Sequence, residues 1–226
     1  DKMVSIKPDL RSYSRVSYLR EIHGDVPGAI EALTMAVQAG APGADNTSWC
    51  MVTLGNLYLQ YGKLTEAAEV FKAALVARPE YPFALEGLAA VEMERKNYQV
   101  AEQMLEQAKA IIPEVGIYEK LAIIYKATSR DADYQRTIEE VIEMMKDDAM
   151  HGHNMDLDFA KVYHELFNDP DMAIKFSLKA YAERPENIDV NGMLASIYTT
   201  KGDHKKAAEH RAKALRTGSK KPELMA

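Results

Sequence analysis

Apolar residues recur at intervals of three and four along residues 48–81, which is the spacing of one face of an α-helix. The first half of this stretch places its apolar residues on one such face: Met51, Leu54, Tyr58 and Tyr61. The second half does the same: Ala67, Val70, Phe71, Ala74 and Leu75. Gly62 stands between the halves, where a left-handed glycine ends a helix, and Pro79 ends the second half. The pattern predicts a helix, a tight turn and a second helix.

This pattern returns with a period of 34 residues. Ala67 and Ala101 are 34 residues apart, and so are Pro79 and Pro113. A period of this length with two helical segments in each unit is the mark of a repeat architecture. We therefore expect about six helix pairs within a single body of residues 1–218, with these bounds: residues 10–43, 48–81, 82–115, 115–150, 153–187 and 188–218.

The fourth pair and the two ends depart from the regular pattern. The fourth pair keeps the pattern only if residues are inserted near Ser129. Residues 219–226 follow the last pair and are expected to form a flexible tail. At the other end, Ile6–Asp9 have the character of the end of a preceding unit, and the chain begins at Asp1 without a methionine. We therefore expect a piece of a longer repeat array.

One helix pair cannot bury its apolar face alone, so successive pairs must stack on one another and form a concave groove. The second pair resembles the signature of the tetratricopeptide-repeat family at these positions: Leu54, Gly55, Tyr58, Ala67, Phe71, Ala74 and Pro79. Met51 stands at the tryptophan position of that signature, and Trp49 lies two residues earlier. The resemblance covers nearly the whole chain, and composition and pattern look similar to those of bacterial members. It implies an all-α fold, a right-handed α-solenoid of about six helix-turn-helix pairs.

The resemblance also implies a binding surface, because the first helix of each pair lines the groove in this family. The partner-binding positions implied in this chain are Tyr18, Trp49, Val52, Asn56, Leu59, Phe83, Glu86, Met93, Lys126 and Lys161. The apolar positions in the first half would suit an extended peptide or a partner helix. Alternatively, Trp49 packs against the segment around Pro42 and shields a junction. We do not expect the carboxylate clamp of the chaperone-binding members, because Val52 and Gly87 stand where lysine and asparagine are needed and only Asn56 matches.

Composition and motifs narrow the class of function. The net charge is -6, and the basic residues form no cluster of the kind that nucleic-acid binding needs. No apolar run approaches the ~18 residues of a membrane span, so we expect no direct membrane insertion. The sequence has no nucleophile turn, phosphate loop or dinucleotide fingerprint. Cys50 lies inside a predicted helix and has the character of a small buried hydrophobe. We therefore expect neither enzymatic activity nor a cofactor.

A histidine-rich segment is the strongest alternative chemistry. Imidazole and carboxylate groups, which can bind zinc together, gather here: His151, His153, Asp156, Asp158 and His164. The segment around Gly152 connects two helix pairs, and such a loop rarely holds ligands in a fixed geometry. We therefore expect no metal site.

Together these observations predict a non-catalytic protein–protein interaction scaffold that binds a peptide or helix in its concave groove. Two alternatives stay open. The chain could be the docking or regulatory segment of a larger protein or enzyme whose other domains lie outside it, or its apolar patch could form a homo-oligomer. The partner is expected to be a protein or peptide. The compartment stays open between bacterial cytoplasm and periplasm, because an export signal could have been removed.

Overall fold

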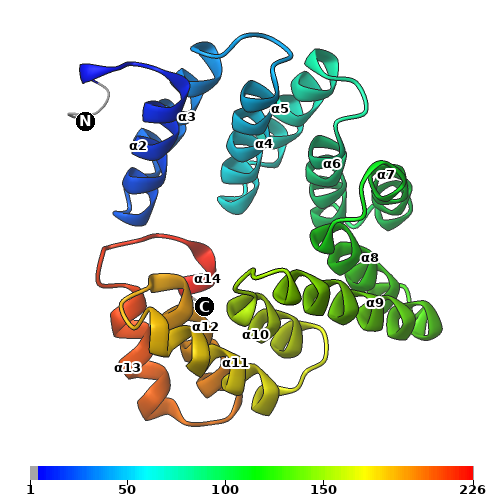
Figure 1. Ribbon diagram of the computed structural model, residues 1–226, viewed down its shortest axis with the longest axis vertical. Helices are drawn as coiled ribbons and strands as arrows, with labels where there is room; N and C mark the ends of the chain where they lie inside the picture. Colours follow the sequence, from blue (N-terminus) through cyan, green and yellow to red (C-terminus); the bar gives the residue numbers. More distant parts are fainter. Residues whose placement is uncertain (1–4, 226) are drawn as a thin grey trace. The chain divides into compact units, whose positions relative to one another are not determined.

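The computed structural model describes residues 5–225, and every regular element within them is a helix (Figure 1). Twelve helices follow one another as six pairs: α2 (Leu10–Ile22) with α3 (Val26–Gln38), α4 (Asp45–Gln60) with α5 (Leu64–Ala77), α6 (Pro82–Glu94) with α7 (Tyr98–Ile111), α8 (Val115–Ala127) with α9 (Asp131–Met150), α10 (Asp156–Glu165) with α11 (Pro170–Glu183), and α12 (Ile188–Thr200) with α13 (His204–Ala214). The short helix α14 (Pro222–Met225) follows. The predicted all-α fold of sequential helix pairs is confirmed. None of the helices in residues 5–225 combines the length and the apolar character that a membrane span needs.

The described chain divides into two compact units: residues 5–113 with 220–222, and residues 114–219 with 223–225. The N-terminal unit contains the first three helix pairs, and the C-terminal unit contains the last three pairs and most of α14. Helix α7, the last helix of the N-terminal unit, ends at Ile111 because the backbone becomes extended at Ile112 (φ -148°, ψ 128°). The following proline favours this extended backbone and has no N–H with which to continue the helix.

The turn within each pair needs one residue in the left-handed conformation, and the chain meets this need in two ways. In three pairs glycine takes the conformation without steric cost: Gly24 (φ 78°), Gly62 (φ 72°) and Gly202 (φ 76°). In the other three pairs a residue with a side chain takes it: Lys96 (φ 62°), Ser129 (φ 58°) and Asn168 (φ 53°). Ser129 therefore belongs to a normal turn. The extra residues of the fourth pair lengthen α9 to 20 residues instead of forming an insertion before it.

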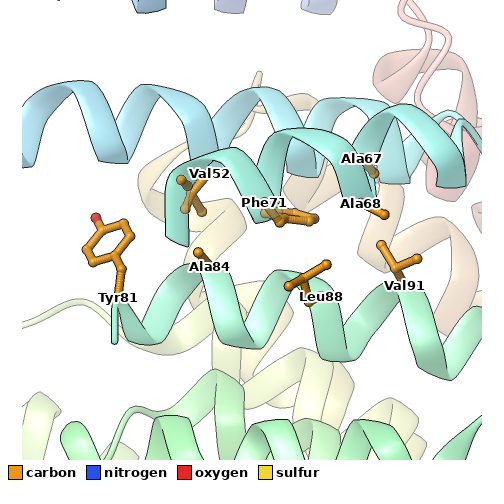
Figure 2. Close-up of a cluster of buried hydrophobic side chains, with 9 residues drawn as sticks. Val52, Ala67, Ala68, Phe71, Tyr81, Ala84, Leu88 and Val91 are labelled. Atoms are coloured by element: carbon orange, nitrogen blue, oxygen red, sulfur yellow. The ribbon is translucent and has the colours of Figure 1, made fainter. Parts of the chain in front are cut away.

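Phe71 of α5 joins the second and third helix pairs. Its side chain is completely buried and lies in a cluster with Ala84 and Leu88 of α6 (Figure 2). A β-carbon at Gly55 of α4 would lie 2.5 Å from the Phe71 ring, and one at Gly87 of α6 would lie 2.2 Å from it. The two glycines therefore leave the space that the ring occupies, and the three helices approach one another closely around it.

Aromatic rings pack between the two helices of the fifth pair, in the C-terminal unit. Phe176 of α11 stacks on Phe159 of α10, with ring centroids 4.8 Å apart, and on Tyr163, at 5.6 Å. Leu194 and Ala207 join α12 to α13 in a buried cluster at positions where the repeat pattern places apolar residues.

Residues 219–226, for which the sequence predicts a flexible tail, include α14. Its Leu224 is buried and packs against Gly192 of α12.

Candidate protein-binding groove

Helices α2 and α4, the first helices of neighbouring pairs, enclose a cavity of about 720 Å³ within the N-terminal unit. Each helix contributes residues spaced by three or four, so that they share one face. From α4 these residues are Trp49, Thr53, Asn56 and Gln60. From α2 they are Ser14, Ser17, Tyr18 and Glu21. We call this cavity the α2–α4 groove.

The α2–α4 groove has an exposed apolar rim above a buried apolar floor. Trp49, Tyr18 and Leu19 remain 52%, 54% and 51% exposed. Leu33 and Leu57, which also line the groove, are buried. The volume lies within the range of about 300–1,000 Å³ typical of ligand pockets. An apolar side chain can enter between the rim residues, while the hydroxyl and amide groups of the two stripes can form hydrogen bonds with a peptide.

Three of the positions expected to bind a partner come together in the α2–α4 groove. Tyr18 reaches it from α2, and Trp49 and Asn56 reach it from α4. All three side chains are exposed.

Three other expected positions pack in the core. Val52 is buried in the cluster around Phe71, because the beginning of α6 covers that side of α4. Leu59 and Phe83 are partly buried against the same cluster, and the ring of Phe83 meets that of Tyr81 edge-on, with centroids 5.4 Å apart. The apolar positions of α4 are therefore divided between two faces of the helix: Trp49 points into the α2–α4 groove, whereas Val52 and Leu59 pack toward the core.

The remaining four expected positions lie on other first helices. Glu86 and Met93 are partly buried on α6 of the N-terminal unit. In the C-terminal unit, the Lys126 ammonium lies 5.4 Å from the centroid of the Tyr134 ring. Lys161 of α10 is also in this unit. Within the N-terminal unit, the expected positions thus divide between the α2–α4 groove, the core and partly buried sites of α6, while Lys126 and Lys161 belong to the C-terminal unit.

Lys161 lies among carboxylates. Its Nζ is 2.8 Å from Oε2 of Glu119 on α8. Burial alone would lower the pKa of Lys161, but Glu119 and nearby carboxylates raise it above its usual value. Burial, together with the charge of Glu119, raises the pKa of Asp158, and burial likewise raises that of Glu165. The Lys161 ammonium is paired with Glu119, and its charge opposes the rise in the pKa of Asp158 and of Glu165.

The candidate chemical groups are dispersed. Among the described residues, no three His, Cys, Asp or Glu side chains gather in a way that could hold a metal ion. His151 Nδ1 lies 2.8 Å from the backbone oxygen of Asp147, whereas His164 Nε2 lies 3.0 Å from the Ser196 hydroxyl. Burial raises the pKa of the Cys50 thiol to about 11, so the thiol stays protonated and unreactive at neutral pH.

Sequence reasoning missed Leu19, which forms part of the groove rim. Leu19 follows Tyr18 directly and therefore points about 100° further around the helix, outside the stripe that the repeat pattern picks out. Only the position of α4 shows that both side chains reach the same cavity.

Two sequence profiles described as "Tetratricopeptide repeat" match the chain, over residues 52–115 and 188–216. These ranges contain most of the second pair, the third pair and the last pair. No curated protein matches the sequence.

Several solved structures share the fold. A tetratricopeptide repeat protein from Parabacteroides merdae is 18% identical, with 98% of this chain and 85% of that chain covered and a TM-score of 0.60. TTC0263, a thermophilic TPR protein of Thermus thermophilus, is 24% identical, with 79% and 95% covered and a TM-score of 0.58. Pseudomonas aeruginosa pilF is 15% identical, with 96% and 95% covered and a TM-score of 0.51. At these identities the likeness concerns the fold.

Repeats of this kind generally form protein-interaction scaffolds and are typically non-catalytic. The sequential helix pairs, the two profile matches and the shared fold together identify this chain as a tetratricopeptide-repeat protein.

Proposed function

We propose that the chain binds a peptide or helix of a partner protein in the α2–α4 groove. The observation that carries this proposal is the half-exposed Trp49 beside Tyr18 at the rim of a cavity of about 720 Å³. Tryptophan is strongly enriched among the residues that dominate binding energy at protein interfaces. A large ring left open to solvent at the mouth of a cavity is a suitable anchor for an apolar side chain of the partner.

Binding in the α2–α4 groove costs the scaffold little conformational entropy. Trp49 and Tyr18 project from helices of 16 and 13 residues, whose backbones are already ordered. Binding therefore immobilises side chains but no loop, and less conformational entropy is lost than in a binding site made of loops. The charged residues Arg15 and Glu21 also line the groove, at positions where they can orient the partner.

Other first helices extend the proposed surface. Glu86 and Met93 of α6 are only partly buried, so a longer ligand could contact them after leaving the groove. Lys126 and Lys161 lie in the C-terminal unit. We propose that Lys126, which is exposed, contacts an acidic group of a partner on that unit, whereas Lys161 is already paired with Glu119.

The proposal is tested by comparing Trp49→Ala with Val76→Ala in quantitative affinity capture of partners from the native host. Val76, on α5, is 84% exposed and lies outside the groove, which makes it the matched control. We expect Trp49→Ala to weaken partner binding about 10–30-fold, the loss typical of an interface hot spot, and Val76→Ala to leave it unchanged. Both variants should keep the wild-type melting temperature.

Unchanged capture by Trp49→Ala with intact folding would show that the α2–α4 groove is not the binding site. Equal losses in both variants would point to a general surface effect and would also contradict the proposal.

A further inference from the structure

Among the described residues that line the α2–α4 groove, Arg15 of α2 is the only one with a positive charge. It precedes Tyr18 by three residues and Leu19 by four, so the three side chains share one side of the helix. Tyr18 and Leu19 form the exposed apolar rim of the groove together with Trp49. Arg15 is exposed as well, and its guanidinium therefore lies about one helical turn from the rim.

The fold itself does not use the Arg15 guanidinium. Within residues 5–225 it forms no hydrogen bond, ion pair or aromatic contact. Arg20 of the same helix differs, because it donates a hydrogen bond to the backbone oxygen of Gly28 and lies 3.4 Å from Glu31. A guanidinium carries five N–H donors, and its planar fork fits a carboxylate with two parallel hydrogen bonds. The donors of Arg15 are therefore available to a ligand of the groove.

The other charged residue of the groove determines where an acidic group can lie. Glu21 follows Arg15 by six residues, which is about 9 Å along the axis of α2. Glu21 already interacts within the chain, and its charge repels a second carboxylate at its own end of the groove. A doubly charged phosphate group is typically bound by several cations, whereas the groove offers one. The arrangement therefore favours a single carboxylate at the Arg15 end.

We propose that the partner segment bound in the α2–α4 groove carries an aspartate or glutamate beside its apolar anchor, and that Arg15 binds this side-chain carboxylate. This inference rests on the proposed function of the groove. Tyr18 and Leu19 lie about 5 Å from Arg15 along the helix axis. A helical ligand spans this distance with three or four residues, and an extended ligand with two, because alternate side chains of a strand share a face. We therefore expect the acidic residue within four positions of the anchor.

The test selects ligands of the full chain from a library of random dodecapeptides displayed on phage. Each peptide is joined to the coat protein at its C-terminus, so that only side chains supply carboxylates. We expect the selected peptides to combine a large apolar residue with an aspartate or glutamate within four positions of it. The most frequent peptide is then synthesised with an amidated C-terminus, and its binding is measured by fluorescence anisotropy. Trp49→Ala should weaken this binding at least about tenfold, because the peptide lies in the groove.

Two arginine variants separate the role of Arg15 from that of the general charge of α2. Arg15→Gln should weaken peptide binding about tenfold, and so should replacement of the acidic residue of the peptide by its amide. Both changes together should weaken binding no more than either alone, because each removes the same contact. Arg11→Gln is the matched control and should leave binding unchanged, since Arg11 is also exposed on α2 but does not line the groove. All variants should keep the wild-type melting temperature.

Peptides that need Trp49 but carry no acidic residue, or that bind Arg15→Gln as tightly as the wild type, would overturn the role of Arg15 and leave the groove as the binding site. Equal weakening by Arg15→Gln and Arg11→Gln would also overturn that role, because the effect would then come from the overall charge of α2. Peptides that Trp49→Ala binds as tightly as the wild type, or a selection that yields no peptide, would overturn the proposed function of the groove and this inference with it.

Discussion

Replacement of Gly87 by alanine tests the close packing around Phe71. A β-carbon at this position would lie 2.2 Å from Cε1 of Phe71, far inside van der Waals contact. The ring has little room to move away, because it is completely buried and a β-carbon position at Gly55 lies only 2.5 Å from it. Even one methyl group therefore forces the ring or α6 to shift.

Two opposing effects set the magnitude. Alanine is the better helix former inside α6 by about 1 kcal/mol. Overpacking a close-packed core costs about 1–3 kcal/mol. The clash is severe and involves a ring held on two sides, so we take the upper part of that range. Gly87→Ala should then lower the free energy of unfolding by about 1–2 kcal/mol.

The assay is urea unfolding followed by circular dichroism at the helical band, with the midpoint and slope compared between variants. In a Phe71→Leu background, Gly87→Ala should be neutral or stabilising, because the smaller side chain leaves space for the methyl group. Ala73→Gly, on the exposed side of α5, measures the helix-propensity difference without a packing change. If Gly87→Ala stabilises the protein by about the amount that Ala73→Gly destabilises it, the ring is not packed against α6 and the reasoning is refuted.

Two further predictions follow from the same structure. Burial, with a contribution from Lys213, lowers the pKa of His210, and burial lowers that of His164, so the unfolded chain takes up protons at higher pH than the folded protein. The stabilising contribution of these histidines should therefore be complete above the ordinary histidine pKa of 6.5 and fall as the pH drops below it. Melting curves at pH 7.5 and 5.5 would show this difference. A higher melting temperature at pH 5.5 would contradict the prediction. Phe83→Ala should lower the melting temperature, because Phe83 packs against the core cluster, whereas Trp49→Ala should leave it unchanged. If only Trp49→Ala lowered the melting temperature, Trp49 would be the core residue and Phe83 the exposed one, contrary to this prediction.

The fold could be predicted from the sequence because its rules are local. A helix must bury one face, so its apolar residues recur every three to four positions, and a repeated pair must recur with the period of the unit. Phe71 and Ala74, placed on the inner face by this pattern, are both completely buried. The left-handed turn residues Lys96 and Ser129 were less visible, because a side chain can adopt that conformation at a modest cost where glycine is absent.

The exposure of each predicted groove position was decided by the tertiary structure alone. Trp49 and Val52 lie three residues apart on α4, yet one lines the α2–α4 groove and the other lies in the core. The difference arises because α6 covers only Val52, and the sequence of α4 does not indicate which of its residues α6 contacts. For the same reason Leu224 was expected in a flexible tail, since its burial depends on Gly192, which is distant in the sequence. The period of a repeat can be read from each segment of the sequence, whereas the accessibility of a side chain depends on which helices pack against it.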